Sequence, residues 1–515
     1  MASLPRLQLD PINPSFLLFA SSILLLLLLK LLFKQTSTRT KPNLPPSPPK
    51  LPIIGNLHHL RGPSPHLSLR RLSTKFGPII YLKLGQVPTV VVSSAKLAES
   101  VLKTNDLSLC SRPPIFSAKH LFYNCTDIAF SPYGAYWRRI RKICILELLS
   151  AKRVQSFGFV REEEVARLIS RIQESYPCAV DLSKMLGLYA NANICRVALG
   201  RDFSHGEEYD CHGFQKMLEQ YQELLGGFSI GDFFPSMEFI HNLTGLKFKL
   251  QETFRCFDRL FDEIINEHRN PDQHKDEHKK DLLDVLLDIM ENRSKSSDGI
   301  HLTIDNVKAI ILDMFAAGTD TTFITLDWAM TELVMNPKVL ETAQAEVRKV
   351  VGERRVVLED DLPQLEYVRA VIKETFRLHP PAPVLLPRES MEDIIINGFD
   401  IPAKTRVFVN AWAIGRDPDL WKNPESFMPE RFLHSVIDFK GQDFRLIPFG
   451  AGRRICPAVS FGTVSVELPL AQLLHSFDWD LPPGIETKKL DLKENFGITM
   501  HRITHLMVIA KPHFP

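Results

Sequence analysis

The pattern of apolar and polar positions changes several times along the 515-residue chain, and each pattern predicts a different element. The first is an apolar run from Phe16 to Phe33, interrupted only by two serines and Lys30. About 20 such residues span a hydrocarbon core of about 30 Å, and a lysine near the end can extend its ammonium group to the interface. The run therefore predicts a membrane anchor, a single transmembrane helix, within residues 1–34.

The charges on either side of this run predict its orientation. Lys34, Arg39, Lys41 and Lys50 follow it, whereas one arginine and one aspartate precede it. By the positive-inside rule, the body that follows lies in the cytoplasm. The alternative is a cleaved signal peptide, but the run is longer than the usual apolar core of about 7–15 residues and no small-residue cleavage site follows.

Proline dominates the next segment. Residues 35–52 are basic and carry six prolines, at positions 42, 45, 46, 48, 49 and 52. Proline fixes the backbone in extended conformations, so we expect a stiff hinge between the anchor and the body. No internal repeat follows, and residues 53–515 are predicted to form one mainly helical domain. Alternating stretches at 78–94 and 394–410 predict a minor β component.

One predicted helix is unusually long and has an unusual centre. Thr303 is a suitable N-cap and Pro337 ends the apolar pattern, which gives a helix of about 30 residues. Its centre reads AGTDTT, residues 317–322. Glycine costs about 1 kcal/mol in a helix interior, and threonine hydroxyls can bond back to the i−4 carbonyl. A simple kink is the plain interpretation, but the combination favours a site where a flat group approaches the helix and Asp320 with Thr321 delivers protons.

Two further stretches offer a charge cluster. In YVRAVIKETFRLHPP, Glu374 and Arg377 lie three residues apart on one helix face, and the prolines end the helix. In FMPERF, Arg431 is a possible further partner of Glu374. Such pairs are common and usually exposed, where they contribute only tenths of a kcal/mol. By themselves they indicate little.

A basic helix is predicted at YWRRIRKI, residues 136–143. Trp137 and Arg141 share one face of it at a spacing of four residues. A solvated basic helix with one buried tryptophan explains this pattern equally well.

The overall charge excludes some classes of partner. The chain has 62 basic and 60 acidic residues, a net charge of +2, which shows no tendency to bind nucleic acid. Its eight cysteines have no paired spacing, which fits a reducing compartment. Three N-glycosylation sequons, at Asn124, Asn242 and Asn292, would matter only in an oxidising lumen.

One cysteine stands in a distinctive loop, FGAGRRICPAVSFG, residues 449–462. No second Cys or His lies at the short spacing that structural zinc needs, and there is no C-x-x-C redox pair. Cys456 is therefore a candidate for a single thiolate ligand of a group that is bound mainly by other means.

The order of these motifs carries a resemblance. The chain has AGTDTT, then E-x-x-R, then P-E-R-F, then F-x-x-G-x-R-x-C, behind an anchor and a proline hinge. This arrangement resembles the haem-thiolate monooxygenases, the cytochromes P-450, over essentially the whole chain. FRLHPPAPVLLPRES and RLIPFGAGRRICPA look like the plant microsomal members that modify specialised metabolites. One departure is Ala458, where the family often has glycine.

The resemblance implies a mainly α fold with a minor β region, in which haem lies between the long central helix and the cysteine loop. It makes Cys456 the thiolate ligand of the haem iron, with Phe449 packing beside the sulfur. Gly450 and Gly452 would let the loop backbone approach the sulfur and the porphyrin. Pro457 would begin the next helix, whose N-terminal dipole helps to keep the sulfur ionised.

The resemblance also assigns the other candidate residues. Four side chains would bind the haem propionates: Trp137, Arg141, Arg388 and Arg454. Glu374, Arg377 and Arg431 would form a buried charge network behind the cysteine loop. On the other side of the haem, Asp320 and Thr321 would deliver protons, while Ala317 and Gly318 widen the helix for O₂.

The substrate and partners follow from the same resemblance. The pocket would draw on five stretches, 112–130, 203–240, 313–321, 382–386 and 496–500, which are mostly apolar. A lipophilic substrate is expected, a terpenoid or a terpene-derived indole alkaloid. Electrons would come from a separate NADPH-dependent cytochrome reductase at the endoplasmic reticulum membrane, attracted by Arg138, Arg139 and Lys142.

Three alternatives remain open at this point. The enzyme could form rings or double bonds by oxidation, or it could be a reductase-independent isomerase or dehydratase. A non-catalytic haem protein is the third, although an O₂-handling helix and a large apolar pocket would be superfluous in it.

Overall fold

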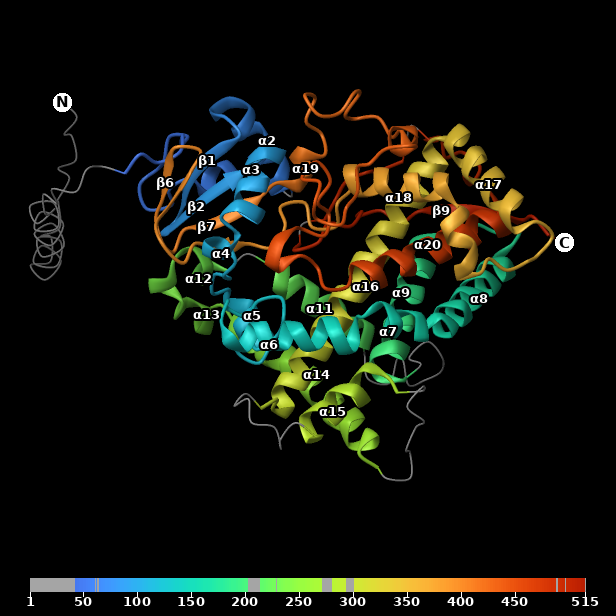
Figure 1. Cartoon of the computed structure of the whole chain (residues 1–515), viewed down its shortest axis with the longest axis horizontal. Helices are drawn as coiled ribbons and strands as arrows, with labels where there is room; N and C mark the ends of the chain where they lie inside the picture. Colours follow the sequence, from blue (N-terminus) through green and yellow to red (C-terminus); the bar gives the residue numbers. More distant parts are fainter. Residues whose placement is uncertain are drawn as a thin grey trace, which may run out of the picture. The chain divides into compact units, whose positions relative to one another are not determined.

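In the computed structural model, the longest helix is α16 (Ile304–Met335), which runs through the centre of the helical body (Figure 1). It begins where the sequence predicts, because the Thr303 hydroxyl accepts from the Asn306 N–H at 3.3 Å and the Asn306 side chain accepts from the Thr303 N–H at 3.0 Å. This reciprocal capping satisfies donors that a helix start otherwise leaves unbonded. The next helix, α17 (Pro337–Val351), has Pro337 at its first position.

The structure describes residues 42–514 except 61, 63, 202–213, 228, 271–279, 293–300, 488–489 and 496. The predicted anchor at 1–34 and the first residues of the predicted hinge lie outside the described residues. Among the described residues, α16 is the one helix long and apolar enough to cross a membrane, and 72% of its most apolar window is buried inside the protein. It is therefore a core helix here.

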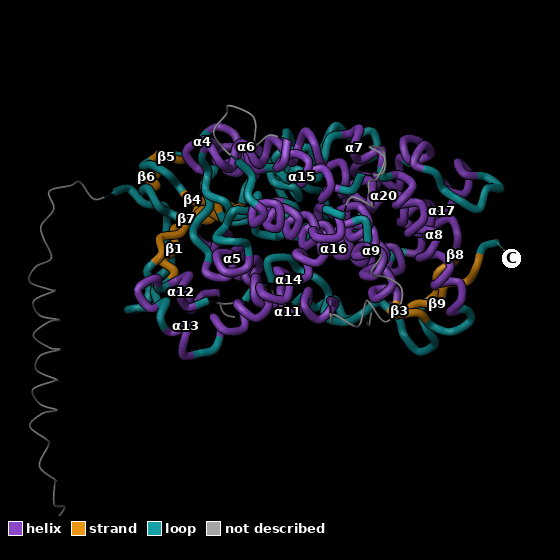
Figure 2. Tube along the Cα trace, turned by 90° about the horizontal axis from the view of Figure 1, so that it is seen from below, coloured by secondary structure: helices purple, strands orange, loops and turns teal. Residues whose placement is uncertain are grey.

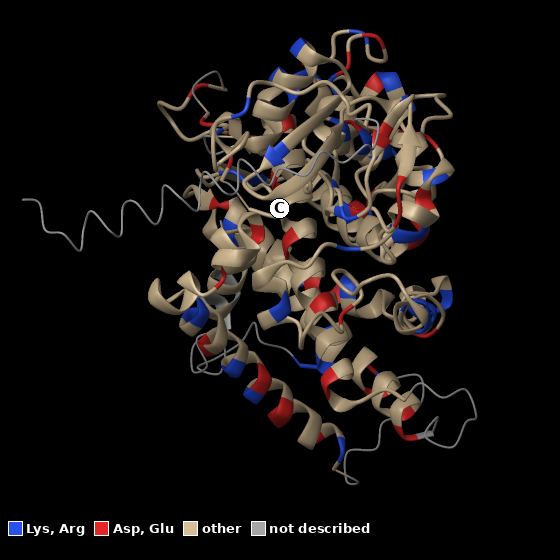
Figure 3. Ribbon diagram, turned by 90° about the vertical axis from the view of Figure 1, so that its left-hand side faces the viewer, with Lys and Arg blue, Asp and Glu red and all other residues tan. Residues whose placement is uncertain are grey.

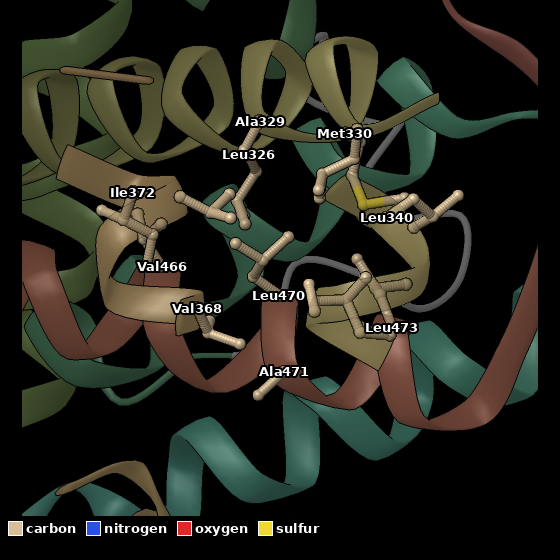
Figure 4. Close-up of a cluster of buried hydrophobic side chains, with 14 of the residues drawn as sticks. Leu326, Ala329, Met330, Leu340, Val368, Ile372, Val466, Leu470, Ala471 and Leu473 are labelled. Atoms are coloured by element: carbon tan, nitrogen blue, oxygen red, sulfur yellow. The ribbon is translucent and has the colours of Figure 1, made fainter. Parts of the chain in front are cut away.

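A group of long helices surrounds α16. They are α8 (Gly158–Ser175), α9 (Leu182–Leu199), α17, α18 (Glu366–Leu378) and α20 (Val459–Ser476). Figure 4 shows side chains of α16, α17, α18 and α20 meeting in one apolar cluster: Leu326, Ala329, Met330, Leu340, Val368, Ile372, Val466, Leu470, Ala471 and Leu473. Burial of this surface fixes α18 and α20 against α16. The candidate site lies between the centre of α16 and the loop that precedes α20.

The other helices of the described chain include the 23-residue α14 and several shorter ones. They are α2 (Pro65–Phe76), α3 (Ala95–Glu99), α4 (Asp106–Leu109), α5 (Phe116–Leu121), α6 (Ala135–Ile143), α7 (Ala151–Ser156), α11 (Phe214–Gly226), α12 (Ile230–Phe233), α13 (Ile240–Leu243), α14 (Leu246–His268), α15 (Leu282–Asn292) and α19 (Ala411–Ile414). Short 3-10 or π-helical turns are η1 (Leu57–Leu60), η2 (Ser100–Thr104), η3 (Cys144–Leu148), η4 (Pro235–Met237), η8 (Glu359–Gln364), η9 (Pro429–Phe432) and η10 (Gly452–Arg454). The predicted helices at 136–143 and before Pro380 are confirmed as α6 and α18.

The strands gather at two ends of this helical body (Figure 2). One sheet has the order β1 (Ile79–Leu84), β2 (Val87–Val92), β7 (Arg406–Val409), β4 (Arg388–Glu389). Its β2–β7 pair is parallel and its other two pairs are antiparallel. A hairpin joins β5 (Ile394–Ile396) and β6 (Phe399–Ile401), and the other end holds β3 (Val180–Asp181), β9 (Met507–Pro512) and β8 (Phe477–Asp480). The predicted mainly helical fold with a minor β component is confirmed.

Part of the predicted hinge packs against the first sheet. The Tyr81 N–H donates to the Pro46 carbonyl at 2.8 Å, and the Asn56 amide donates to the Pro48 carbonyl at 3.1 Å. Leu44 to the C-terminus form one compact unit. Basic and acidic residues are interspersed along its backbone (Figure 3), as expected for a net charge near zero.

Candidate active site

The loop around Cys456 forms what we term the proximal wall, residues 449–458. Gly450 and Gly452 both have a φ of 70°, a left-handed conformation that favours glycine. A Cβ on Gly452 would lie 2.1 Å from the Leu102 carbonyl oxygen, so a side chain is also excluded sterically. The Cys456 N–H donates to the Phe449 carbonyl at 2.9 Å, which closes the loop.

The environment of the Cys456 thiol has opposing effects on its ionisation. Burial raises the pKa of Cys456, whereas the Ala458 N–H, 3.4 Å from the sulfur, and the Arg141 guanidinium lower it. The prediction that Pro457 begins the next helix was wrong: α20 starts at Val459 with Ala458 as its N-cap. Proline therefore shapes the turn before the helix, and the residue after it supplies the N–H that faces the sulfur.

A cavity of about 800 Å³ separates the proximal wall from the centre of α16. Cys456, Phe449 and Gly450 line one side, and Ala317 and Thr321 line the other. Ala317 is exposed although almost all of α16 is buried, because it faces this cavity. The volume lies within the range of sites that bind a cofactor and a small molecule.

All five stretches expected to line the pocket contribute described residues to it. α15 and the segment around His501 contribute as well, through Leu282, Asn495 and His501. Their sequences show no motif, so sequence reasoning did not include them.

Four arginines line the cavity: Arg112, Arg141, Arg388 and Arg454. Burial is the largest cause that lowers the pKa of each, and for all except Arg388 neighbouring arginines lower it further. For Arg454 the pKa falls to about 9. So many buried cations destabilise one another unless an anion is present.

Their hydrogen-bond partners contain little negative charge. Arg388 donates to the Asp106 carboxylate at 2.6 Å, whereas the other three donate to backbone carbonyls in the described structure. Arg112, for example, donates to Ala129, Leu386 and Pro387. An excess of buried or half-buried guanidinium groups in one cavity with a half-buried thiol fits a bound group that carries carboxylates and a metal that accepts a thiolate ligand. The residues present thus fit haem.

Trp137 lies behind these arginines and does not line the cavity. Its indole N–H donates to the Ile128 carbonyl at 3.0 Å. The Arg454 and Arg141 guanidinium groups lie 4.0 and 5.5 Å from its ring centroid. In this structure Trp137 positions the two arginines by cation–π contacts. A direct contact with a propionate stays a prediction.

Arg112 was missed by sequence reasoning. It stands before Pro113 and Pro114 in the sequence SRPP, and an arginine beside two prolines has no specific spacing to a partner. Only the fold brings it beside Arg454, from a position 342 residues earlier in the chain.

The structure brings Glu374, Arg377 and Arg431 together behind the proximal wall. Arg377 donates two bonds of 2.7 Å to the Glu374 carboxylate, and both side chains are completely buried. Arg431 adds a bond of 3.1 Å and the Met428 N–H one of 2.7 Å. On the same helix as Glu374, Phe376 packs its ring 5.2 Å from that of Phe449, so the network supports the cysteine loop.

The centre of α16 forms what we term the distal wall, residues 313–325. The Thr321 hydroxyl donates to the Ala317 carbonyl at 2.7 Å. The Asp320 carboxylate accepts from the Thr499 hydroxyl, and burial raises the pKa of Asp320. A Cβ on Gly318 would lie 3.0 Å from Ile194, so this glycine also lets α9 pack closely against α16.

Comparison with known proteins agrees with this geometry. The chain matches the family described as "Cytochrome P450" over residues 45–507. It is 72% identical over 498 residues to cytochrome P450 71AP13 of Prunus mume, which covers 97% of this chain and 96% of that one. Premnaspirodiene oxygenase of Hyoscyamus muticus is 45% identical over 504 residues, 96% of this chain and 99% of the relative.

A zebrafish cytochrome P450 solved with progesterone superimposes with a TM-score of 0.75 at 28% identity, over 87% of this chain and 100% of the other. Fold, family match and relatives therefore agree, and the chain belongs to the cytochrome P450 family, as a haem-thiolate, O₂-dependent monooxygenase of the plant type.

Proposed function

We propose that Cys456 binds the haem iron and that the enzyme inserts one oxygen atom from O₂ into a lipophilic plant specialised metabolite, a terpenoid or a terpene-derived indole alkaloid. The observation that carries the proposal is a half-buried thiol that lines the same cavity of about 800 Å³ as Ala317, with four arginines in the lining. Haem, when bound, supplies the oxygen activation and the electron transfer to O₂.

The proximal residues would hold the haem and exclude water from the sulfur. The four arginines of the cavity lining would bind the two propionates, whose negative charge would offset the mutual repulsion of the guanidinium groups: Arg112, Arg141, Arg388 and Arg454. Phe449 would exclude water from the sulfur, and the Ala458 N–H with Arg141 lowers the pKa of the Cys456 thiol against the larger, opposite effect of burial. The Glu374 network keeps the loop in place through the contact between Phe376 and Phe449.

The distal residues would deliver protons to the reacting oxygen. The Thr321 hydroxyl faces the cavity and donates to the Ala317 carbonyl, so its oxygen lone pairs are available to accept a proton and pass it on. Asp320 lies on the same wall and accepts from Thr499, a contact that holds its carboxylate beside the cavity. A carboxyl with a raised pKa carries a proton nearer to neutral pH and so suits proton delivery.

The similarity to premnaspirodiene oxygenase supports the terpenoid class. The lining points the same way, because aromatic and aliphatic side chains form most of it: Phe122, Ile128, Phe130, Ile194, Met314 and Leu386. A surface of this kind binds lipophilic molecules and leaves few groups for a phosphorylated or polyanionic one.

For the electron donor we propose an NADPH-dependent cytochrome reductase. Arg138 and Lys142 are exposed on α6, the helix that also carries Arg141 to the proximal side of the cavity. An acidic flavin protein would be attracted to them, and salt would screen the attraction. Rising ionic strength should then slow turnover while leaving substrate binding unchanged.

For the location we propose the endoplasmic reticulum membrane, with residues 1–34 as a single-pass anchor and the catalytic body in the cytoplasm. The body itself exposes large apolar side chains around α13: Met237, Phe239, Leu243 and Phe248. An exposed apolar patch of this kind is typical of a membrane contact. Protease added to sealed microsomes should remove the catalytic body, and its protection would contradict the proposed orientation.

The decisive experiment is spectroscopic. The purified full-length protein, reduced and exposed to carbon monoxide, should show the red-shifted Soret band of thiolate-ligated haem. Cys456→Ser should lack that band, and turnover of lipophilic test compounds by the wild type should require both NADPH and added reductase. A nitrogen-ligand spectrum of the wild-type protein, or a thiolate spectrum retained by Cys456→Ser, would contradict the proposal.

A further inference from the structure

Tyr221, on α11, has a hydroxyl group without a hydrogen-bond partner among the described residues. The residue is 1% exposed and lines the cavity. Its ring packs edge-on against Phe122 and Phe257, with centroids 5.8 and 5.6 Å away, so the aromatic ring is well held while the hydroxyl is not bonded. A buried hydroxyl that lacks a partner destabilises a protein, which makes a bound molecule the natural partner.

A carboxylate pair lies close enough to act on Tyr221. Asp313, on α16, lines the cavity, and its carboxylate accepts from the Ile128 N–H at 2.6 Å and from the Ala129 N–H at 3.2 Å. Together with burial, the charges of Asp313 and Asp127 raise the pKa of the Tyr221 phenol. The hydroxyl therefore stays protonated and faces a negative potential.

Asp127 and Asp313 are themselves a pair. The Asp127 Oδ1 atom has no donor N–H or O–H group in the described structure, and Asp313 becomes its hydrogen-bond partner only when one of the two carboxyls is protonated. Both are buried, Asp127 completely and Asp313 with 6% of its surface exposed, so we take them to share one proton. The charge that remains is partly balanced by Arg112, whose guanidinium lowers the pKa of Asp127.

The position of Asp313 on α16 sets its distance from Ala317 and Thr321. Asp313, Ala317 and Thr321 follow one another at four-residue intervals on α16 and all line the cavity. At about 1.5 Å per residue, Asp313 lies about 6 Å along the helix from Ala317 and about 12 Å from Thr321. A group bonded near Asp313 is thus one to two helical turns from the segment where oxygen is activated.

We propose that Tyr221 and Asp313 form a subsite for a hydroxyl group of the substrate, so that this enzyme acts on lipophilic alcohols at a carbon remote from that hydroxyl. The Tyr221 hydroxyl donates to the substrate oxygen, and the Asp313 carboxyl accepts the substrate O–H. A cationic group of the substrate is disfavoured at this subsite, because Arg112 already balances part of the charge of the Asp127–Asp313 pair. The inference rests on the proposed function and adds its substrate class.

The test uses the haem-loaded full-length enzyme and matched probes on several terpenoid skeletons. Each set contains a hydrocarbon, its alcohol and its quaternary ammonium analogue, which cannot coordinate iron. Titration of the Soret shift gives the affinities. On at least one skeleton the alcohol should bind more tightly than the hydrocarbon by about three- to tenfold, the strength of a hydrogen bond between neutral groups.

Tyr221→Phe should remove this preference without weakening hydrocarbon binding. It should also leave the melting temperature of the unliganded enzyme unchanged or higher, because the deleted hydroxyl has no hydrogen-bond partner within the described part of the chain. Tyr189→Phe is the matched control, since the Tyr189 hydroxyl is buried, donates to the Ser465 carbonyl at 3.1 Å and does not line the cavity. That variant should melt at a lower temperature and keep the preference.

Three results would overturn the subsite: no alcohol preference on any skeleton, a preference that survives Tyr221→Phe, or tighter binding of the ammonium analogue than of the alcohol. The carbon monoxide spectrum separates this failure from a failure of the proposed function. With the thiolate band present, only the subsite is wrong; without it, both fail.

Discussion

On the proximal side of the cavity, the Glu374 carboxylate receives four hydrogen bonds, from Arg377 twice, from Arg431 and from the Met428 N–H. On the distal side, the Tyr221 hydroxyl receives none in the described structure, and Asp127 and Asp313 bond to each other only through a shared proton. Both regions are buried. The first satisfies its polar groups within the protein, whereas the second leaves polar groups that a small molecule can satisfy.

This difference separates two requirements of one enzyme. The group held by the proximal wall is the same in every catalytic cycle, so a fully bonded, rigid network suits it. The distal wall must accept a substrate that enters and leaves, and unsatisfied polar groups there provide orientation when it binds. Substitutions in the two regions should accordingly have different consequences, and four predictions test this.

The largest effect is expected for Glu374→Ala. Removal of one partner of a buried ion pair strands the other charge and costs about 3–5 kcal/mol, a large part of the stability of a domain. We expect no soluble, haem-loaded protein. The control is Glu99→Ala, because Glu99 pairs with Lys103 at 2.9 Å with about half of each side chain exposed. Its loss should change the free energy of unfolding by about 0.5 kcal/mol or less. A soluble, haem-replete Glu374→Ala protein would contradict the network's role.

The second effect concerns pH on the distal side. Burial raises the pKa of Asp127 to about 7, above its ordinary value of about 4. Between these values the folded protein holds a proton that the unfolded chain has released, so the free energy of unfolding falls as pH rises from about 4 to about 7. Asp127→Asn should reduce this slope, because an amide N–H replaces the proton that Asp127 holds, whereas Asp313, whose pKa burial also raises, keeps its own contribution.

Denaturant unfolding at pH 5 and pH 8 would measure this pH dependence of the free energy of unfolding. From pH 5 to pH 8, the free energy of unfolding of the variant should rise by about 1–3 kcal/mol relative to that of the wild type. A parallel pH dependence of both proteins would show that Asp127 does not titrate in this window, and the description of a shared proton would then be wrong.

A third, smaller effect is expected for Arg141→Gln on the proximal side. Arg141 lines the cavity, lowers the pKa of Cys456 and donates to the Ile455 carbonyl at 2.5 Å. Loss of one charge-assisted contact should weaken haem binding about tenfold, or about 1.4 kcal/mol. Transfer of haem to an apoprotein acceptor measures this. Arg138→Gln, on the exposed face of the same helix, should retain haem like the wild type.

Local patterns in the sequence were enough to predict caps and turns whose interacting residues are close together in the chain. The capping of α16 by Thr303 and Asn306 depends on residues three positions apart, and the turn at Cys456 depends on adjacent glycines. These could be predicted because local geometry and residue type fix them.

Contacts between distant segments could not be predicted in this way. The Thr499 hydroxyl meets Asp320 across 179 residues of chain, and Arg112 meets Arg454 across a longer separation. That the Tyr221 hydroxyl has no partner among the described residues depends on several segments that are distant in sequence, so no local pattern could predict it. The proximal motifs could therefore be predicted from the sequence, whereas the distal subsite of Tyr221 and Asp313 could not.

The smallest structural effect, with a clear functional one, is expected for Thr321→Ala. Deleting this hydroxyl removes one bond within α16, to the Ala317 carbonyl, and should leave folding, haem content and substrate affinity nearly unchanged. If the hydroxyl relays protons, more of the electrons from NADPH should instead appear as hydrogen peroxide, and product per NADPH should fall severalfold. The matched control is Thr319→Ala. Thr319 makes the same kind of bond, 2.9 Å to the Phe315 carbonyl, but does not line the cavity. Equal uncoupling in both variants would assign the effect to the helix backbone, whereas uncoupling in Thr321→Ala alone would place the proton path at the distal wall.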